Sequence, residues 1–291
     1  MIGPLSLWAR LGRLGVVLEM IKFEHTVFAL PFAFMGLVLG SGGRPEGRLI
    51  AWVLLAMIGA RSAAMAFNRL VDAPYDARNP RTSGRALPRG LVSRAFVAWF
   101  VALSAALFFL AASQLNRACL LLSPLALAVV LGYSYTKRFT AASHLVLGAA
   151  LGLAPIGGWM AAGAPLAAPP LLLGAGVLFW VAGFDILYSL LDLDFDRSHG
   201  LFSLPSRLGP QRALAAARLL HAGSAALFGL AGLAAGLSAA YFIGVALVTA
   251  FLVAQHLLVS PTDLTRLNVS FFTLNGLVSV VLLAAACLGV G

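Results

Sequence analysis

Nine stretches of about 20 mostly apolar residues follow one another along this chain, and they leave it few possible folds. They lie near residues 20–40, 49–70, 95–113, 117–135, 143–162, 169–190, 213–235, 238–259 and 268–290. A stretch of this length matches a helix that crosses a bilayer, and a helix satisfies all its backbone polar groups internally. The pattern therefore predicts an all-α membrane protein with nine transmembrane helices in a single domain, 1–291.

The composition excludes a soluble protein of this length. Hydrophobic residues make up 61% of the chain and charged residues only 10%, whereas soluble domains carry about 25% charged residues. The net charge of +10 does not indicate a nucleic-acid partner, because the basic residues lie in short loops between the predicted spans. Residues 1–18 lack the pattern of a cleavable signal and predict a lead-in on the membrane surface.

The loops alternate in charge, which predicts the orientation of the chain. The N-terminal segment and every second loop, including the cap loops 71–94 and 191–212, hold most of the arginines and lysines. The opposite side holds Arg44, Arg48 and Arg117. By the positive-inside rule the first side is cytoplasmic, and an odd number of spans leaves the C-terminus outside. The prediction is a multi-pass protein of a cell (inner) membrane.

Acidic residues are rare in this chain, and six of the ten lie in two short windows. Asn68, Asp72 and Asp76 recur every four residues after the second span, and Tyr188, Asp192 and Asp196 do so after the sixth, with Asp185 and Asp194 nearby. The two windows stand at a constant offset of 120 positions. Spacing by four puts side chains on one face of a helix. The offset predicts two pseudo-repeated four-helix units plus one helix.

Two facing carboxylate clusters repel each other, so a cation is expected between them. Oxygen ligands without nearby His or Cys favour a hard ion, Mg²⁺ or Mn²⁺, and Mg²⁺ typically bridges carboxylates to phosphates. Basic residues agree with a phosphate-bearing substrate, because guanidinium groups suit phosphate oxygens. The candidates are Arg61 within a span, Arg78, Arg81 and Arg85 after the first window, and Lys137 and Arg138 after the fourth span. The alternative for such residues is membrane orientation alone.

Four segments carry a resemblance to a known family. NRLVDAPYD at 68–76, followed by ARNPRT and LPRG, and DILYSLLDLDFD at 185–196 resemble the two aspartate-rich motifs of the UbiA family of membrane prenyltransferases. YSYTKR at 133–138 resembles the family's loop after the fourth span, and residues 21–36 resemble the first span of its 4-hydroxybenzoate and menaquinone-pathway members.

This resemblance implies nine helices around a central cavity, and Mg²⁺-dependent transfer of a polyprenyl group from a polyprenyl diphosphate to an aromatic acid. It implies that Asn68, Asp72, Asp76, Asp192 and Asp196 hold Mg²⁺ and the diphosphate, that Asp185 and Tyr188 shape the pocket, and that Arg61, Lys137 and Arg138 lie near the diphosphate. Lys22 takes the place of a basic residue in the family's first span. In place of the family's KxGxKS-like stretch this chain has Ser198 to Ser203, so Arg197 or His199 is expected to substitute.

The acceptor is the least determined part of the prediction. The first span favours a hydroxybenzoate-like or naphthoate-like acid. The first candidate is 4-hydroxybenzoate, in respiratory quinone biosynthesis, with a dihydroxynaphthoate or haem as alternatives. Lys22 or Arg61 would bind an acceptor carboxylate, and His25 would steer the phenol or simply form an interfacial hydrogen bond. A non-catalytic membrane transporter is the alternative of another class, but its charges would line a path through the bilayer midplane.

Overall fold

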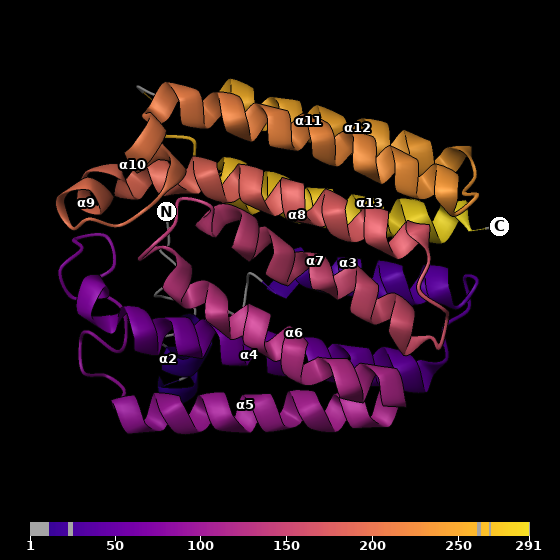
Figure 1. The fold of residues 1–291 in the computed structure, drawn as a ribbon, viewed down its shortest axis with the longest axis horizontal. Coiled ribbons are helices and arrows are strands. Elements are labelled where there is room, and N and C mark those ends of the chain that lie inside the picture. The colour runs from indigo at the N-terminus through magenta and orange to yellow at the C-terminus, as the bar shows by residue number, and fades with distance from the viewer. Residues whose placement is uncertain (1–11, 23–25, 261–262, 268, 291) are drawn as a thin grey trace.

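The computed structural model describes residues 12–22, 26–260, 263–267 and 269–290, which fold into a bundle of long helices (Figure 1). Within this part of the chain, eight helices are long and apolar enough to cross a membrane, and a shorter apolar helix, Phe28–Gly40, lies within the first predicted span. The predicted fold class, an all-α membrane protein, is confirmed, and eight long helices plus this shorter one are consistent with the nine predicted spans.

The long helices correspond one by one to the predicted spans. They are α3 (Thr26–Gly40), α4 (Gly47–Asp76), α5 (Arg94–Leu115), α6 (Arg117–Thr136), α7 (Ser143–Ala161), α8 (Ala168–Ser189), α11 (Pro210–Ala234), α12 (Ala239–Leu258) and α13 (Asn275–Gly289). The shorter helices are α2 (Gly12–Met20), α9 (Leu193–Ser198) and α10 (Leu204–Leu208). A 3₁₀ turn, Leu190–Asp192, joins α8 to α9, and a π-helical segment, Val269–Leu274, precedes α13.

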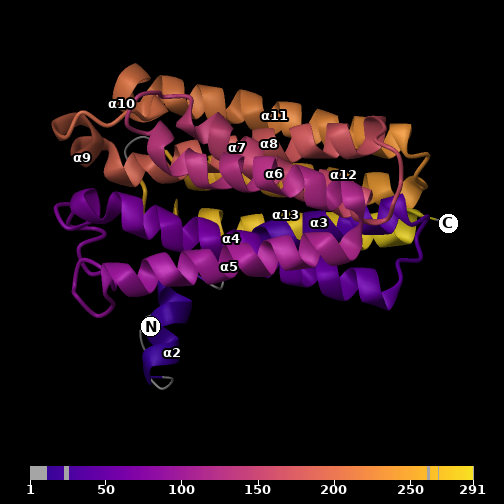
Figure 2. The same cartoon turned by 60° about the horizontal axis from the view of Figure 1, so that its bottom comes forward.

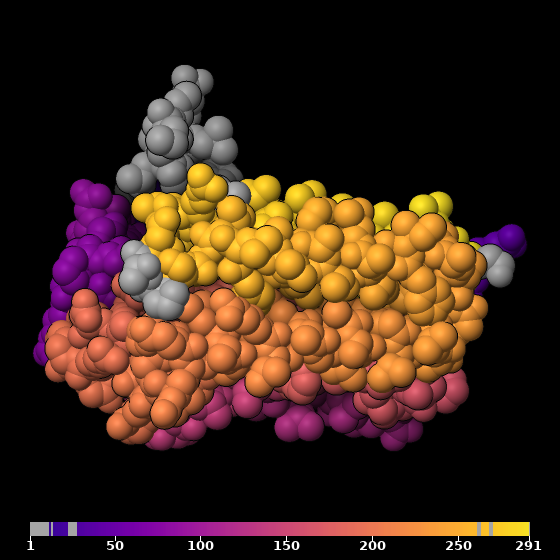
Figure 3. Space-filling view, turned by 90° about the horizontal axis from the view of Figure 1, so that it is seen from above, coloured from indigo at the N-terminus to yellow at the C-terminus, as the bar shows by residue number. Residues whose placement is uncertain are grey.

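The outer surface of the bundle is apolar along its length. Figure 3 shows the flank formed by α11 and α12, where Leu219, Leu233, Ile243 and Leu257 expose more than two thirds of their surface. Exposed leucines and isoleucines in such number are costly in water. Lipid is therefore the solvent of this flank.

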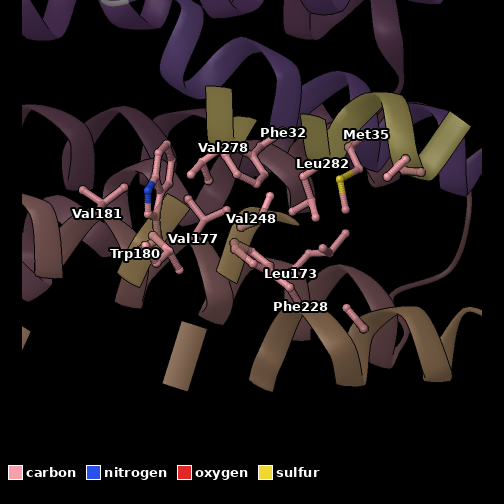
Figure 4. Close-up of a cluster of buried hydrophobic side chains, with 14 of the residues drawn as sticks. Phe32, Met35, Leu173, Val177, Trp180, Val181, Phe228, Val248, Val278 and Leu282 are labelled. Atoms are coloured by element: carbon pink, nitrogen blue, oxygen red, sulfur yellow. The ribbon is translucent and has the colours of Figure 1, made fainter. Parts of the chain in front are cut away.

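The main core fills the space between α3, α8 and the three C-terminal helices. Trp180 on α8, Phe32 on α3 and Phe228 on α11 are fully buried there, together with Val248 and Leu282 (Figure 4). The Phe32 ring lies 5.2 Å from Trp180 and 5.9 Å from Phe228 between centroids, within the range of attractive ring contacts. This core holds α8 in place, and α8 leads into the second acidic window.

The N-terminal helix lies outside the bundle. Helix α2 projects from the long helices at a steep angle (Figure 2), and the Arg69 side chain of α4 donates a 3.2 Å hydrogen bond to the Met20 carbonyl at its end. Residues 1–11 of the predicted lead-in fall outside the described residues. A position of this segment on the membrane surface stays a prediction.

Both acidic windows lie at the same end of the bundle. In Figure 1 the end of α4, the loop after it, and α9 and α10 all lie on the left, while the C-terminus lies on the right. The first window belongs to one helix, because α4 continues to Asp76. The second window differs from the sequence expectation of a single helical face. The chain leaves α8 through the 3₁₀ turn at Asp192, so Asp192 and Asp196 belong to different elements.

Candidate active site

The first window presents its polar groups along the last turns of α4. The Asn68 amide donates a 2.8 Å hydrogen bond to Asp72 Oδ2, as expected for residues four apart on one face. The buried Arg69 guanidinium donates in turn to Asn68 Oδ1 at 3.2 Å. Asn68 therefore has a fixed orientation, with its amide toward Asp72.

The first cap loop connects the two windows. The Asn79 amide donates a 2.9 Å hydrogen bond to Asp192 Oδ1, and Arg81 Nε donates to the same oxygen at 2.8 Å. Arg81 Nη2 binds the other oxygen of Asp192, and Arg81 Nη1 donates to the Tyr188 hydroxyl at 3.3 Å. A forked guanidinium fixes both the position and the plane of a carboxylate. Residues more than 110 positions apart thus meet at one point.

The first window also affects the pKa of Arg81. Burial opposes its charge, but the bonds to Asp192 and the nearby Asp76 raise the pKa of Arg81 above its usual value. The guanidinium therefore stays charged between the two acidic windows.

Each of the four aspartates predicted to be catalytic has one basic partner. The pairs are Asp72 with Arg138 at 3.5 Å, Asp76 with Arg85 at 2.7 Å, Asp192 with Arg81, and Asp196 with Lys137 at 3.0 Å. These cations come from the first cap loop and from the segment after α6. The site is thus a cluster of four acid–base pairs at one end of the bundle.

Asp196 is the most deeply buried of the four, with 1% of its surface exposed. Lys137 Nζ lies 3.0 Å from its Oδ1, but the angles are not those of a hydrogen bond, and neither carboxylate oxygen receives one from the described residues. A buried carboxylate without donors is costly, because its charge has lost the hydration of water. These two oxygens are suited to a cationic ligand.

The donor set fits Mg²⁺ in type. The candidate ligands Asn68, Asp72, Asp76, Asp192 and Asp196 offer only oxygen, and the two oxygens of Asp196 are buried without donors. Within the described part of the chain, no three Asp, Glu, His or Cys side chains come close enough to hold a metal ion by themselves. Mg²⁺ commonly takes one or two carboxylates and completes its coordination with water and substrate phosphates, which agrees with this arrangement.

Several other predicted site residues contact this cluster or lie next to it in the structure. Arg138 donates to the Val71 carbonyl at 2.8 Å and lies over the rings of Tyr75 and Tyr135. The Tyr188 ring packs against the Phe271 ring with 4.2 Å between their centroids, and the Tyr188 hydroxyl accepts the hydrogen bond from Arg81. Asp185, one turn before Tyr188, accepts a 2.7 Å hydrogen bond from His144.

The remaining predicted residues are placed differently. Arg78 is exposed, and Arg81 and Arg85 make the contacts to the acids instead. Arg61 is half-buried in α4, seven residues before Asn68. Lys22 pairs with Glu19 at 3.0 Å beyond the end of α2, and His25 falls outside the described residues.

The proposed substitutes for the family's basic stretch lie at the surface. Arg197 and His199 are exposed at the end of α9, and the His199 ring stacks on Phe195 at 4.0 Å. The basic residue that contacts Asp196 of the second window is Lys137 instead.

Three residues that bind the acidic windows were not singled out as site residues from the sequence. Asn79 lies in the string ARNPRT, and that resemblance could have indicated it. Arg69 lies next to Asn68, but its bond to the Met20 carbonyl follows only from the packing of α2 on α4. His144 begins α7, and nothing in its sequence surroundings connects it to Asp185.

Comparison with known proteins agrees with this geometry. Residues 29–277 match the sequence model of the UbiA prenyltransferase family. The 4-hydroxybenzoate octaprenyltransferase of Albidiferax ferrireducens is 32% identical over 204 residues, which cover 68% of each chain.

Solved structures have the same fold. The apo structure of a UbiA homolog from Aeropyrum pernix K1 has a TM-score of 0.82 at 40% identity, covering 90% of this chain and 96% of that one. A UbiA homolog from Archaeoglobus fulgidus, bound to GPP and Mg²⁺, has a TM-score of 0.71 at 22% identity, covering 93% and 98%. With a family match over most of its length, this multi-pass membrane protein belongs to the UbiA prenyltransferase family.

Proposed function

We propose that this protein transfers a polyprenyl group from a polyprenyl diphosphate to an aromatic acid, with 4-hydroxybenzoate as the first candidate acceptor, in respiratory quinone biosynthesis. The observation that carries the proposal is the cluster of four aspartates, each paired with a basic residue, from distant segments at one end of the bundle. The name of the Albidiferax relative supports the acceptor, and the ligands of the Archaeoglobus homolog support the donor. A dihydroxynaphthoate and haem are the alternative candidate acceptors for the same prenyl transfer.

In this proposal Asn68, Asp72, Asp76, Asp192 and Asp196 hold Mg²⁺ together with the diphosphate. Bound Mg²⁺ supplies Lewis-acid stabilisation of the negative charge on the departing diphosphate. The carboxylates lie where a lipid-soluble substrate would present its headgroup, at the end of apolar helices.

The basic residues bind the same leaving group. Arg81, Lys137 and Arg138 pair with carboxylates in the structure, and in this proposal they bind phosphate oxygens when the substrate is present. Their charge stabilises the diphosphate as the bond between the allylic carbon and oxygen breaks. A ring carbon beside the acceptor's phenol oxygen then attacks that allylic carbon and loses its proton. The apolar helices exclude water, which would otherwise capture the cation.

Acceptor binding is assigned to cations near the start of the bundle. Arg61 within α4 and Lys22 beyond α2 are the candidates for the acceptor carboxylate, and His25 for its phenol. Arg61 is favoured by its position two turns below Asn68 on the same helix.

The site end of the bundle is assigned to the cytoplasmic side of a cell (inner) membrane. The basic residues of the cap loops gather at this end, and Arg44, Arg48 and Arg117 lie at the other. This places the C-terminus outside.

A product assay tests the proposal. Purified protein in detergent receives geranyl diphosphate, Mg²⁺ and one acceptor from a panel of 4-hydroxybenzoate, a dihydroxynaphthoate and haem. We expect prenylated 4-hydroxybenzoate, and we expect none after chelation of Mg²⁺. Prenylation of another acceptor alone would overturn the acceptor assignment. No product with any acceptor, from protein that is monodisperse and folded, would overturn the enzymatic proposal.

A further inference from the structure

His144 lies between the second acidic window and the second cap, and the reaction as described does not use it. It is the second residue of α7 and only 2% exposed. Its Nδ1 lies 2.7 Å from Asp185 Oδ2, and its Nε2 accepts a 3.1 Å hydrogen bond from the Leu204 backbone N–H. One imidazole therefore binds α8 and the start of α10 at the same time.

These two bonds determine the tautomer of the ring. A backbone N–H can only donate, so Nε2 carries the lone pair. The ring proton of the neutral imidazole is then on Nδ1, and Nδ1 donates it to Asp185. Both nitrogens are fully used, and the ring has one orientation.

A second clamp from the same segment binds the other end of the window. The Lys137 ammonium pairs with Asp196, and the Lys137 carbonyl accepts a 2.8 Å hydrogen bond from the Phe202 N–H. Lys137 and His144, at the two ends of this stretch, each contact one aspartate of the second window and one backbone group of the second cap. In the sequence, Asp192 lies between these two aspartates, Asp185 and Asp196.

We propose that His144 is a positioning residue, which couples closure of the second cap loop (191–212) to the orientation of Asp185 beside the diphosphate site. The proposal rests on the proposed function. The His144 bond occupies Asp185 Oδ2, which fixes the plane of the carboxylate. Asp185 lies three residues before Tyr188 on α8, and the Tyr188 hydroxyl accepts a hydrogen bond from Arg81, so the fixed carboxylate lies near the contacts that join the two windows. When the cap is seated, Leu204 holds the ring, and the ring holds Asp185.

Two substitutions at position 144 separate hydrogen bonding from packing. His144→Gln keeps one donor and one acceptor, whereas His144→Phe keeps a ring of similar size without either. Leu145→Phe is the matched control, because Leu145 is the next residue and its side chain is exposed. The kinetic readouts are kcat and KM for geranyl diphosphate and for Mg²⁺.

We expect His144→Phe to raise both KM values about tenfold or more with a smaller change in kcat. His144→Gln should stay within about threefold of the wild type, because it preserves both bonds. Asp185→Asn combined with His144→Phe should cost no more than the worse single variant, as expected for residues that act as one unit. Unchanged KM values in folded His144→Phe protein, equal loss in the Gln and Phe variants, or additive effects would each overturn the proposal.

A readout independent of activity separates this proposal from the proposed function. Arg197 and Arg207 are exposed in the second cap and are trypsin sites. His144→Phe should accelerate cleavage after these arginines severalfold, because Leu204 loses its acceptor, and His144→Gln should not. If the wild type makes no product but the cleavage pattern is as expected, the proposed function fails and the coupling of cap and ring stands. Cleavage that is the same in all variants overturns the coupling whatever the activity.

Discussion

Asp196 shows why a buried charge points to function at the level of a single residue. Its oxygens are buried and receive no hydrogen bond from the described residues, and the side chain of its basic partner Lys137 is 35% exposed. Such a carboxylate contributes little to stability and can oppose it. Its chemistry, rather than its packing, accounts for its presence.

We therefore predict that Asp196→Asn lowers prenyl transfer by about a hundredfold or more without lowering the unfolding temperature. The amide is isosteric and removes the cost of the buried charge. Activity and thermal unfolding in detergent are measured together. Asp194→Asn is the control, because Asp194 is exposed two residues away and should keep near-normal activity. Loss of fold in Asp196→Asn, or equal activity loss in both variants, would contradict this interpretation.

Arg81 provides a second test at this scale. Its fork binds both oxygens of Asp192, and an ammonium group lacks that geometry. We expect Arg81→Lys to raise KM for the prenyl diphosphate about tenfold or more, which corresponds to about 1.4 kcal/mol or more. Arg89→Lys, at an exposed position of the same loop, should leave KM unchanged. Equal KM values in the two variants would remove Arg81 from the site.

At the scale of elements, close helix crossings depend on glycine. An added Cβ at Gly36 of α3 would collide with the Pro155 carbonyl of α7, whereas Gly157 on α7 has open space around it. We predict that Gly36→Val lowers the unfolding temperature by several degrees, because α3 and α7 must separate. Gly157→Val is the matched control and should unfold within a degree or so of the wild type. Equal unfolding temperatures for the two variants would contradict the crossing.

A buried amide joins three helices near the start of α13. Asn275 is fully buried, and its Oδ1 accepts hydrogen bonds from Trp180 on α8 at 2.9 Å and Gln255 on α12 at 2.7 Å. Its amide donates to the Phe271 carbonyl in the π-helical segment at 2.9 Å. We expect Asn275→Leu to cost about 1–3 kcal/mol, because two buried donors lose their acceptor. Chemical unfolding in mixed micelles measures it, and an unchanged midpoint would show that the network is not stabilising.

Most helices could be predicted from the sequence, because a helix in contact with lipid requires a run of about 20 mostly apolar residues. The short gap between the predicted spans 95–113 and 117–135 is an example: α5 ends at Leu115, and the Asn116 side chain caps α6 by accepting from the Cys119 N–H. Spacing by four placed Asn68 and Asp72 on one helical face, and the hydrogen bond between them agrees with that. The same spacing wrongly continued one helix through the second window, because periodicity does not reveal a 3₁₀ break.

Long-range contacts of the loops could not be predicted. Arg78 and Arg81 have the same charge in the same loop, and only the approach of the second window distinguishes them. The contact of His144 with Asp185 depends on how α7 packs against α8. Such contacts follow from tertiary structure and leave no local pattern in a single sequence.

For the whole molecule, the account depends on the meeting of two distant acidic windows at one end of the bundle. Arg81 and Asn79 join them through Asp192, where the first window lies at the end of α4 and the second runs from α8 into α9. The internal duplication and the central cavity stay predictions. A shared site requires that damage to either window affects the same ligand.

The most direct measurement is the binding of geranyl diphosphate to the purified protein, by calorimetry, with and without Mg²⁺ and without an acceptor. We predict Mg²⁺-dependent binding in the wild type that is weakened about a hundredfold or more by Asp72→Asn and equally by Asp192→Asn. Binding that ignores Mg²⁺, or that survives loss of either aspartate in folded protein, would contradict the shared site.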